Sequence, residues 1–139
     1  IMLAELNSID LDSYTDNILK ISQVFIKILK EHNLKLYTDG TDSHLILIDL
    51  KEMNLTGKDY EDLLLEQHIL VNRNQMPNDT RKASLASGIR IGILTLATLN
   101  MSEEEYRQIA SLIASTITQK KVIDIFLAKE IIKKYKIIQ

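Results

Sequence analysis

Residues 88–93 limit the fold of this chain most strongly, because they read Gly-Ile-Arg-Ile-Gly-Ile. Alternate residues of a β-strand point to opposite faces. The three isoleucines are therefore predicted to face a core, while Gly88, Arg90 and Gly92 share the other face. A strand that is apolar on one face only belongs to a sheet that is covered by helices on that side.

Four stretches carry the three- and four-residue apolar spacing of amphipathic helices. They cover residues 11–31, about 56–67, about 102–117 and 123–138. Asp10 or Asp12 is expected to cap the first of them. The second and third open on capping boxes, in which a Ser or Thr is followed three residues later by an acidic residue. These boxes pair Thr56 with Asp59 and Ser102 with Glu105.

The remaining apolar segments predict short strands over residues 34–38, 44–50, 69–72 and 88–93. Residues 44–50 are nearly all apolar, which predicts a strand that is buried on both faces. Residues 74–87 are polar and irregular and are expected to form a loop. This order of elements predicts an α+β fold, with a small, mainly antiparallel sheet and helices packed on it.

Composition limits the classes of function that remain open. The 139 residues are predicted to form one domain over residues 1–139, and 45% of them are hydrophobic, enough for a core. The formal charge of −2 argues against a nucleic-acid partner, and the absence of cysteine excludes disulfides and thiolate nucleophiles. No apolar run approaches the roughly 20 residues of a membrane span, so a cytoplasmic location without a membrane partner is expected. Residue 1 is isoleucine, which leaves open whether the chain is a piece of a longer protein.

Arg90 is the first candidate for a binding residue. A glycine on each side of it along the same strand face leaves space around the guanidinium, which could hold a carboxylate through two hydrogen bonds. The alternative is an ion pair with a structural Asp or Glu, and the pattern alone favours that alternative.

Other polar groups have a structural explanation that the pattern favours. The amides of Asn72 and Asn74 could contact the polar edge of a heterocycle, but such residues are also common in turns. Asp42, Ser43 and His44 lie too close together in the chain for a catalytic triad, which converges from separate elements. The three histidines are too scattered to predict a metal site. The basic stripe of residues 120–136 favours docking on this domain or a partner over binding to a membrane surface.

Four motifs occur together in a characteristic order. They lie at residues 40–45 (G-T-D-S-H-L), 49–58 (D-L…L-T-G-K), 71–79 (V-N-R-N…P-x-D) and 87–92 (S-G-I-R-I-G). Their order and spacing resemble the C-terminal small domain of serine hydroxymethyltransferase, a family of fold-type-I pyridoxal-phosphate enzymes, and the last motif is identical to the family's. The resemblance covers residues 3–117 and extends more weakly to residue 135.

The resemblance implies a function for the complete enzyme and a role for two residues here. The family interconverts serine and glycine with pyridoxal phosphate and tetrahydrofolate, usually as a homo-oligomer. Its motifs place Arg90 on the α-carboxylate of the amino-acid substrate and Asn74 on folate. The family's Schiff-base lysine lies in a large domain upstream of these motifs, on the same or another chain. This chain alone is therefore expected to be inactive and to bind neither cofactor tightly.

The chain also departs from the family pattern. The family continues G-T-P-A-x-T-T-R-G, whereas residues 93–100 lack the Thr-Pro step and carry Leu99 where the arginine would stand. Thr80 and Ala83 replace prolines, and Arg73 replaces a lysine. Two alternatives follow from these departures. One is a related pyridoxal-phosphate aldolase or transaldolase, and the other is a free-standing, non-catalytic binding module.

Overall fold

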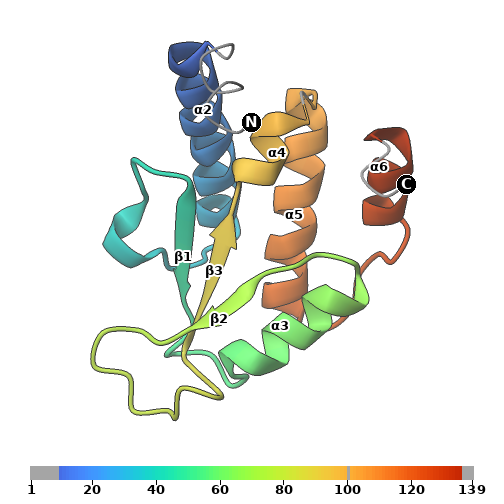
Figure 1. Cartoon of the computed structure of the whole chain (residues 1–139). Helices are drawn as coiled ribbons and strands as arrows, with labels where there is room; N and C mark the ends of the chain where they lie inside the picture. Colours follow the sequence, from blue (N-terminus) through green and yellow to red (C-terminus); the bar gives the residue numbers. More distant parts are fainter. Residues whose placement is uncertain (1–9, 100, 136–139) are drawn as a thin grey trace.

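A computed structural model describes residues 10–99 and 101–135 (Figure 1). Over these ranges the chain forms five helices, a 3-10 turn and three strands, which confirms the α+β prediction. The elements are α2 (Leu11–Glu31), η1 (Tyr37–Asp39), β1 (Leu45–Asp49), α3 (Gly57–Glu66), β2 (Asn72–Asn74), β3 (Gly88–Gly92), α4 (Leu94–Thr98), α5 (Glu103–Gln119) and α6 (Leu127–Tyr135).

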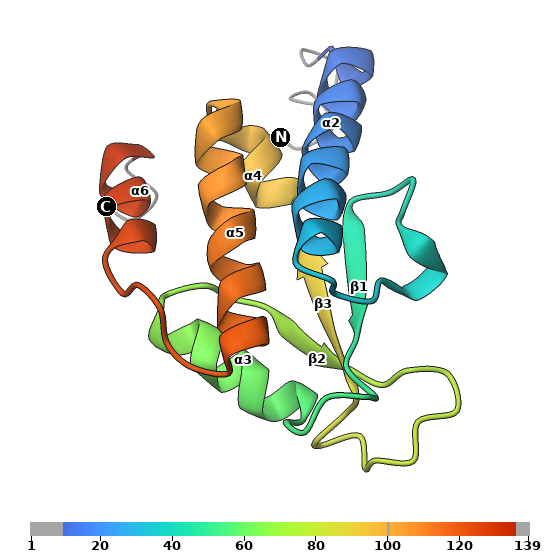
Figure 2. The same cartoon turned by 180° about the vertical axis from the view of Figure 1, so that it is seen from behind.

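The sheet is antiparallel throughout, and β3 lies between β1 and β2. Helices α2 and α5 lie side by side, with α6 next to α5 on the side away from α2 (Figures 1 and 2). The isoleucines of β1 and β3 join one buried cluster with side chains of α2 and α5. Ile89, Ile91 and Ile93 are all buried, as the alternation predicted. No helix in the described ranges is long and apolar enough to span a bilayer.

The predicted starts of α2, α3 and α5 are confirmed by their capping hydrogen bonds. The carboxylate of Asp10, rather than that of Asp12, accepts a hydrogen bond from the Ser13 amide at 3.2 Å. Both predicted capping boxes form, at Thr56 and at Ser102. Helix α5 continues two residues beyond the predicted end. These features are local in sequence, which is why spacing alone could predict them.

Two predicted strands were wrong in position. Of residues 34–38, only Leu36 makes a β-bridge, and the chain then turns through Thr38, whose φ is 58°. The predicted strand 69–72 is replaced by β2, which begins at Asn72. His68 has a φ of 61°, and the amide of Ile69 still donates to Leu64 at the end of α3, so the chain is not yet extended there.

The prediction that residues 44–50 are buried on both faces was also wrong. Ile46 and Ile48 are fully buried, but Leu45 on the opposite face is 36% exposed. That face carries Arg90 and is open at this end of the sheet. Helix α4 was not predicted. The predicted C-terminal helix is shorter in the structure, since α6 spans Leu127–Tyr135, and the end of the predicted stripe lies outside the described residues.

A buried glutamine connects the last part of the chain to the rest. Gln67 is fully buried, and its Nε2 donates to the Leu63 carbonyl and, at 2.8 Å, to the Thr116 hydroxyl of α5. Its Oε1 accepts from the amides of Ile123 and Asp124, at 2.9 and 3.0 Å. One side chain therefore links the end of α3, the body of α5 and the segment that leads into α6.

Tyr60→Phe is expected to leave the free energy of unfolding unchanged or to raise it by up to about 1 kcal/mol. Tyr60 is fully buried, and within the described part of the chain its hydroxyl has no hydrogen-bond partner, so removing it removes a desolvation cost. The matched control is Tyr106→Phe, because the Tyr106 hydroxyl donates to the Leu96 carbonyl at 3.3 Å. The free energy of unfolding of Tyr106→Phe is expected to fall by about 1 kcal/mol. Urea unfolding measures both, and a loss above about 1 kcal/mol for Tyr60→Phe would contradict the prediction.

Candidate functional site

Arg90 lies at the centre of the sheet. Its Cα is paired with Leu47 of β1 on one side and with Asn72 of β2 on the other. The residue is exposed, and within residues 10–99 and 101–135 no acidic group lies within ion-pair distance of its guanidinium. The alternative of a structural ion pair is therefore not seen in the described part of the chain.

The two glycines beside Arg90 differ in the space they leave. A Cβ placed on Gly92 would meet only the Leu45 side chain, at 3.8 Å, so this side is open as predicted. A Cβ on Gly88 would lie 2.5 Å from the sulfur of Met76 and 2.9 Å from the Asn74 carbonyl oxygen. The prediction of open space on both sides was therefore wrong at Gly88, where a side chain from the 75–87 loop fills the space.

Asn74 shares a sheet face with Arg90. Asn72 pairs with Arg90 and Asn74 pairs with Gly88, so Asn74 is a diagonal neighbour of the arginine. Such neighbours lie about 7–8 Å apart between Cα atoms. The Asn74 amide nitrogen donates to the Gln75 carbonyl at 2.8 Å, which leaves its side-chain oxygen available as an acceptor. The structure thus brings both predicted site residues to one face. Asn72, whose amide was also a candidate for contact with a heterocycle, lies on the same face directly opposite Arg90.

Arg73 faces away from this site. Both its backbone amide and its guanidinium donate to the Glu61 carboxylate of α3. This pairing attaches β2 to α3. The replacement of the family's lysine by arginine therefore falls on a structural contact rather than on the face of Arg90.

The other candidate groups have structural roles. Thr41 and Ser43 bond to each other through their hydroxyls at 2.9 Å, and the Ser43 amide donates to the Thr41 hydroxyl at 3.1 Å, so these side chains stabilise a local bend of the backbone. His32 caps the end of α2 through its backbone amide. Among the residues that the structure describes, no three His, Asp or Glu side chains are placed to hold a metal ion.

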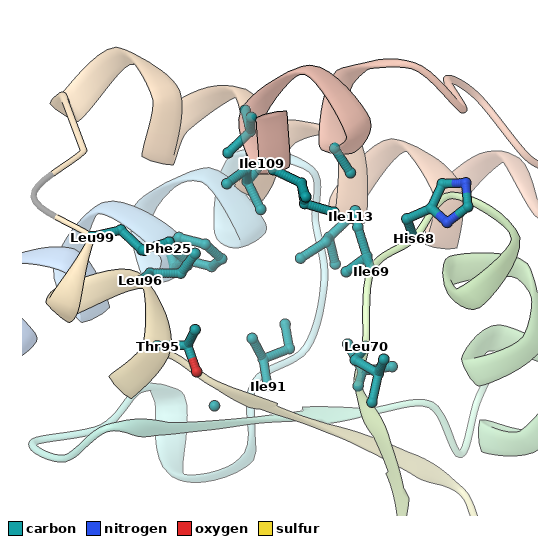
Figure 3. Close-up of a pocket in the computed structure, with 15 residues that line it drawn as sticks. Phe25, His68, Ile69, Leu70, Ile91, Thr95, Leu96, Leu99, Ile109 and Ile113 are labelled. Carbon is teal, nitrogen blue, oxygen red and sulfur yellow. The ribbon is translucent and has the colours of Figure 1, made fainter. Parts of the chain in front are cut away.

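An apolar cavity of about 240 Å³ lies beyond the end of β3, between residues 68–71 and helices α4, α5 and α6 (Figure 3). Among the described residues that line it, only His68 and Thr95 have polar side chains. Leu99 contributes to its wall. From the segment in which this chain departs from the family pattern, Thr95, Leu96 and Leu99 therefore line a mainly apolar cavity.

Asp79 organises the loop between β2 and β3. Its carboxylate accepts from the Ser87 amide at 2.8 Å and the Ser87 hydroxyl at 2.6 Å, and from the amides of Arg81 and Met76 at 2.9 and 3.2 Å. Burial raises the pKa of this carboxyl, but the hydrogen bonds from Ser87, Arg81 and Met76 outweigh it and lower the pKa to about 2. Asp79 therefore stays ionised in the folded protein at any pH near neutral.

The lowered pKa of Asp79 predicts a loss of stability in acid. Because the folded-state pKa lies below the unfolded value near 3.8, the ionised carboxyl stabilises the fold above about pH 4. This contribution, roughly 2 kcal/mol, is lost as the pH falls from about 4 to about 2. Urea unfolding of the wild type and of Asp79→Asn across this range measures it. The variant is expected to be less stable at pH 7 and to show a flatter pH dependence, and equal slopes for both proteins would contradict the assignment.

The comparison with known proteins decides the family. The serine hydroxymethyltransferase family model matches residues 1–113. The chain belongs to the serine hydroxymethyltransferase family. It is 37% identical over 130 residues to serine hydroxymethyltransferase of Ehrlichia canis (strain Jake), which covers 91% of this chain and 31% of the relative.

Two further relatives agree with this assignment. Identity is 39% over 106 residues to serine hydroxymethyltransferase 1 of Pseudomonas fluorescens (strain Pf0-1), covering 76% of this chain and 26% of the relative. It is 41% over 108 residues to serine hydroxymethyltransferase of Thiobacillus denitrificans (strain ATCC 25259 / T1), covering 78% of this chain and 26% of the relative. The matches span between 26% and 31% of these curated relatives' own lengths.

Proposed function

We propose that this chain is the C-terminal small domain of a serine hydroxymethyltransferase, and that Arg90 binds the α-carboxylate of the amino-acid substrate. The observation that supports this most directly is the exposed guanidinium in the middle of the sheet, with an open position at Gly92 beside it. Membership of the family indicates that the substrate is an amino acid. The geometry supplies a cation that no acidic group neutralises within the described residues.

A guanidinium suits this task because its N–H groups match the two oxygens of a carboxylate. Holding the carboxylate fixes the orientation of the substrate about its Cα, which is a positioning contribution to the rate. A central strand of an antiparallel sheet is a rigid support for such a group, since β3 is hydrogen-bonded on both sides. Arg90 would thus orient the amino acid rather than exchange protons with it.

The cofactor would be held elsewhere in the complete protein. Pyridoxal phosphate, when bound, stabilises negative charge at the substrate Cα, so that the bond to the hydroxymethyl carbon can form or break. The strand positions on the face of Arg90 are Leu45, Leu47, Asp49, Asn72, Asn74, Gly88 and Gly92, and none of them is a lysine. These residues do not fit the attachment of this cofactor, so we derive no step through it for this chain.

Tetrahydrofolate is the second group that the family implies, and Asn74 is the residue we assign to it. The Asn74 amide lies on the face of Arg90, one diagonal position away. An amide can match the donor and acceptor edge of a heterocycle. A one-carbon carrier held there would lie next to an amino acid held by Arg90.

We infer that a larger, cofactor-binding domain covers this face in the complete enzyme. Leu45 lies beside the open position at Gly92, with which its Cα is paired, and it is 36% exposed. Apolar side chains beside an exposed arginine are typical of a surface that is covered by another part of the protein. The matched segments cover only 26% to 31% of the relatives, which therefore have the length for such a domain.

Comparing the binding of glycine and of glycinamide by the complete protein that carries this chain, loaded with pyridoxal phosphate, tests the proposal. The two compounds differ in that glycinamide lacks the carboxylate. Isothermal titration is expected to show saturable glycine binding and at least about tenfold weaker binding of glycinamide, because Arg90 then faces no anion. Equal affinities would show that the carboxylate is not recognised and would overturn the assignment of Arg90.

A further inference from the structure

The loop of residues 75–87 joins the two strands that carry the site. It leaves from Asn74 and returns at Gly88, and these two residues are paired across β2 and β3. Loops of this length without secondary structure are uncommon in compact domains, and an ordered one needs internal connections. The loop runs along one end of the sheet, away from α2 and α5 (Figure 1).

The Asp79 carboxylate provides those connections within the loop. Its Oδ2 accepts from the amides of Met76, near the start of the loop, and Ser87, at its end. Its Oδ1 accepts from the Arg81 amide and the Ser87 hydroxyl. A single carboxylate therefore holds the start and the end of the loop together.

Three further hydrogen bonds attach this arrangement to the rest of the molecule. The guanidinium of Arg81, whose amide Asp79 binds, donates to the carbonyls of Met53 and Leu55 at 3.1 Å each. The Ser87 carbonyl accepts from the Leu50 amide at 2.8 Å, just beyond the end of β1. The loop is thus anchored at Arg81 and at Ser87, the residue just before β3.

Met76 connects the loop to the site itself. It is 4% exposed, and its sulfur occupies the space that a side chain at Gly88 would take. Since Gly88 and Arg90 lie two residues apart on one strand, their side-chain positions share a face. Met76 therefore forms the wall of the Arg90 site on the side of Gly88. Its own amide is one of the donors that Asp79 holds, at 3.2 Å.

We propose that Asp79 is a positioning residue for Arg90. Its carboxylate fixes Met76 over Gly88 and fixes Ser87 just before β3, and so sets the wall of the Arg90 site on the side of Gly88. Asp79 touches neither substrate nor cofactor. The proposal rests on the proposed function, because it takes the Arg90 guanidinium as the group that binds the substrate carboxylate.

The test measures glycine binding to the complete protein, loaded with pyridoxal phosphate, by isothermal titration, which gives both a dissociation constant and the number of active sites. Asp79→Asn keeps the size of the side chain but turns an N–H group toward donors. It is expected to raise the dissociation constant about tenfold, with the number of active sites nearly unchanged, since small displacements of a binding group have effects of this size or larger. Ser87→Ala removes only one of the four donors and is expected to raise the constant about two- to threefold.

The matched control is Asp62→Asn, an exposed carboxylate on α3 that pairs with Lys58. It is expected to leave glycine binding unchanged. If Asp79 has a merely structural role, Asp79→Asn lowers the number of active sites but leaves the glycine dissociation constant of the sites that still bind unchanged. That result would overturn the proposal. If Asp79→Asn does not fold, an unchanged glycine dissociation constant in Ser87→Ala would overturn the proposal for Asp79. If Arg90→Ala itself leaves glycine binding unchanged, the proposed function fails, and the proposal for Asp79 fails with it.

Discussion

Arg90→Ala in the complete enzyme is expected to weaken glycine binding by about 30-fold to 5,000-fold. Truncating one partner of a desolvated, hydrogen-bonded charge pair costs roughly 2–5 kcal/mol, because the other charge is left without its partner. Within the described chain, Arg90 has no acidic neighbour in ion-pair distance that would share this energy. Isothermal titration with glycine measures the change directly.

Two further variants make this result specific. Arg90→Lys keeps the positive charge but loses the fork of two N–H groups, so an intermediate loss of affinity is expected. Arg107→Ala removes an exposed arginine on α5 that pairs with Glu103, and glycine affinity is expected to stay the same. Unchanged affinity in Arg90→Ala, or an equal loss in Arg107→Ala, would rule out Arg90 as the carboxylate-binding residue.

Gly57→Ala is expected to destabilise the fold by about 3 kcal/mol, although helix propensity alone predicts the opposite. Gly57 is the first residue of α3, and alanine is favoured over glycine in helices by about 1 kcal/mol. A Cβ there would lie 2.5 Å from the Gly88 carbonyl oxygen and 3.2 Å from that of Leu85. The amides of Gly57 and Lys58 donate to Ala86 and Leu85, so the backbone is held in this close approach. Overpacking against fixed backbone costs 1–3 kcal/mol and sometimes more.

Gly92→Ala is the matched control for this prediction. A Cβ at Gly92 would meet only the Leu45 side chain, at 3.8 Å. Its free energy of unfolding is expected to stay within about 0.5 kcal/mol of the wild type, or to rise slightly, because alanine costs less conformational entropy than glycine. Urea unfolding at pH 7 compares the two variants. If Gly57→Ala is as stable as the wild type, the start of α3 and residues 85–88 can move apart, and the prediction is wrong.

The parts of the fold that could be predicted are those that depend on neighbours in the sequence. The capping boxes at Thr56 and Ser102 and the buried face of β3 follow from spacings of two to four residues. The exposure of Leu45 could not be predicted, because it depends on which face of the sheet the helices cover. The start of β2 depends in the same way on how the chain leaves α3 through His68.

In the candidate site, too, only the features that depend on neighbours in the sequence could be predicted. Arg90 could be singled out because alternation placed it on the face opposite the isoleucines. The position of Met76 over Gly88 could not be predicted, because it joins residues on either side of a turn in the 75–87 loop. Asp79 was noticed only as part of a motif, since four donors from three different residues become visible only when the loop is closed.

The way in which Gln67 holds the last part of the chain has a consequence for sequence variation. Among the described residues, its oxygen accepts from the backbone amides of Ile123 and Asp124, and every non-proline residue has such an amide. The connection between α5 and α6 can therefore change its side chains at these two positions without losing this attachment. It would not tolerate proline at either position, or a change of length that moves both amides away. Homologues that keep a glutamine here are accordingly free to diversify this segment while α6 stays in place.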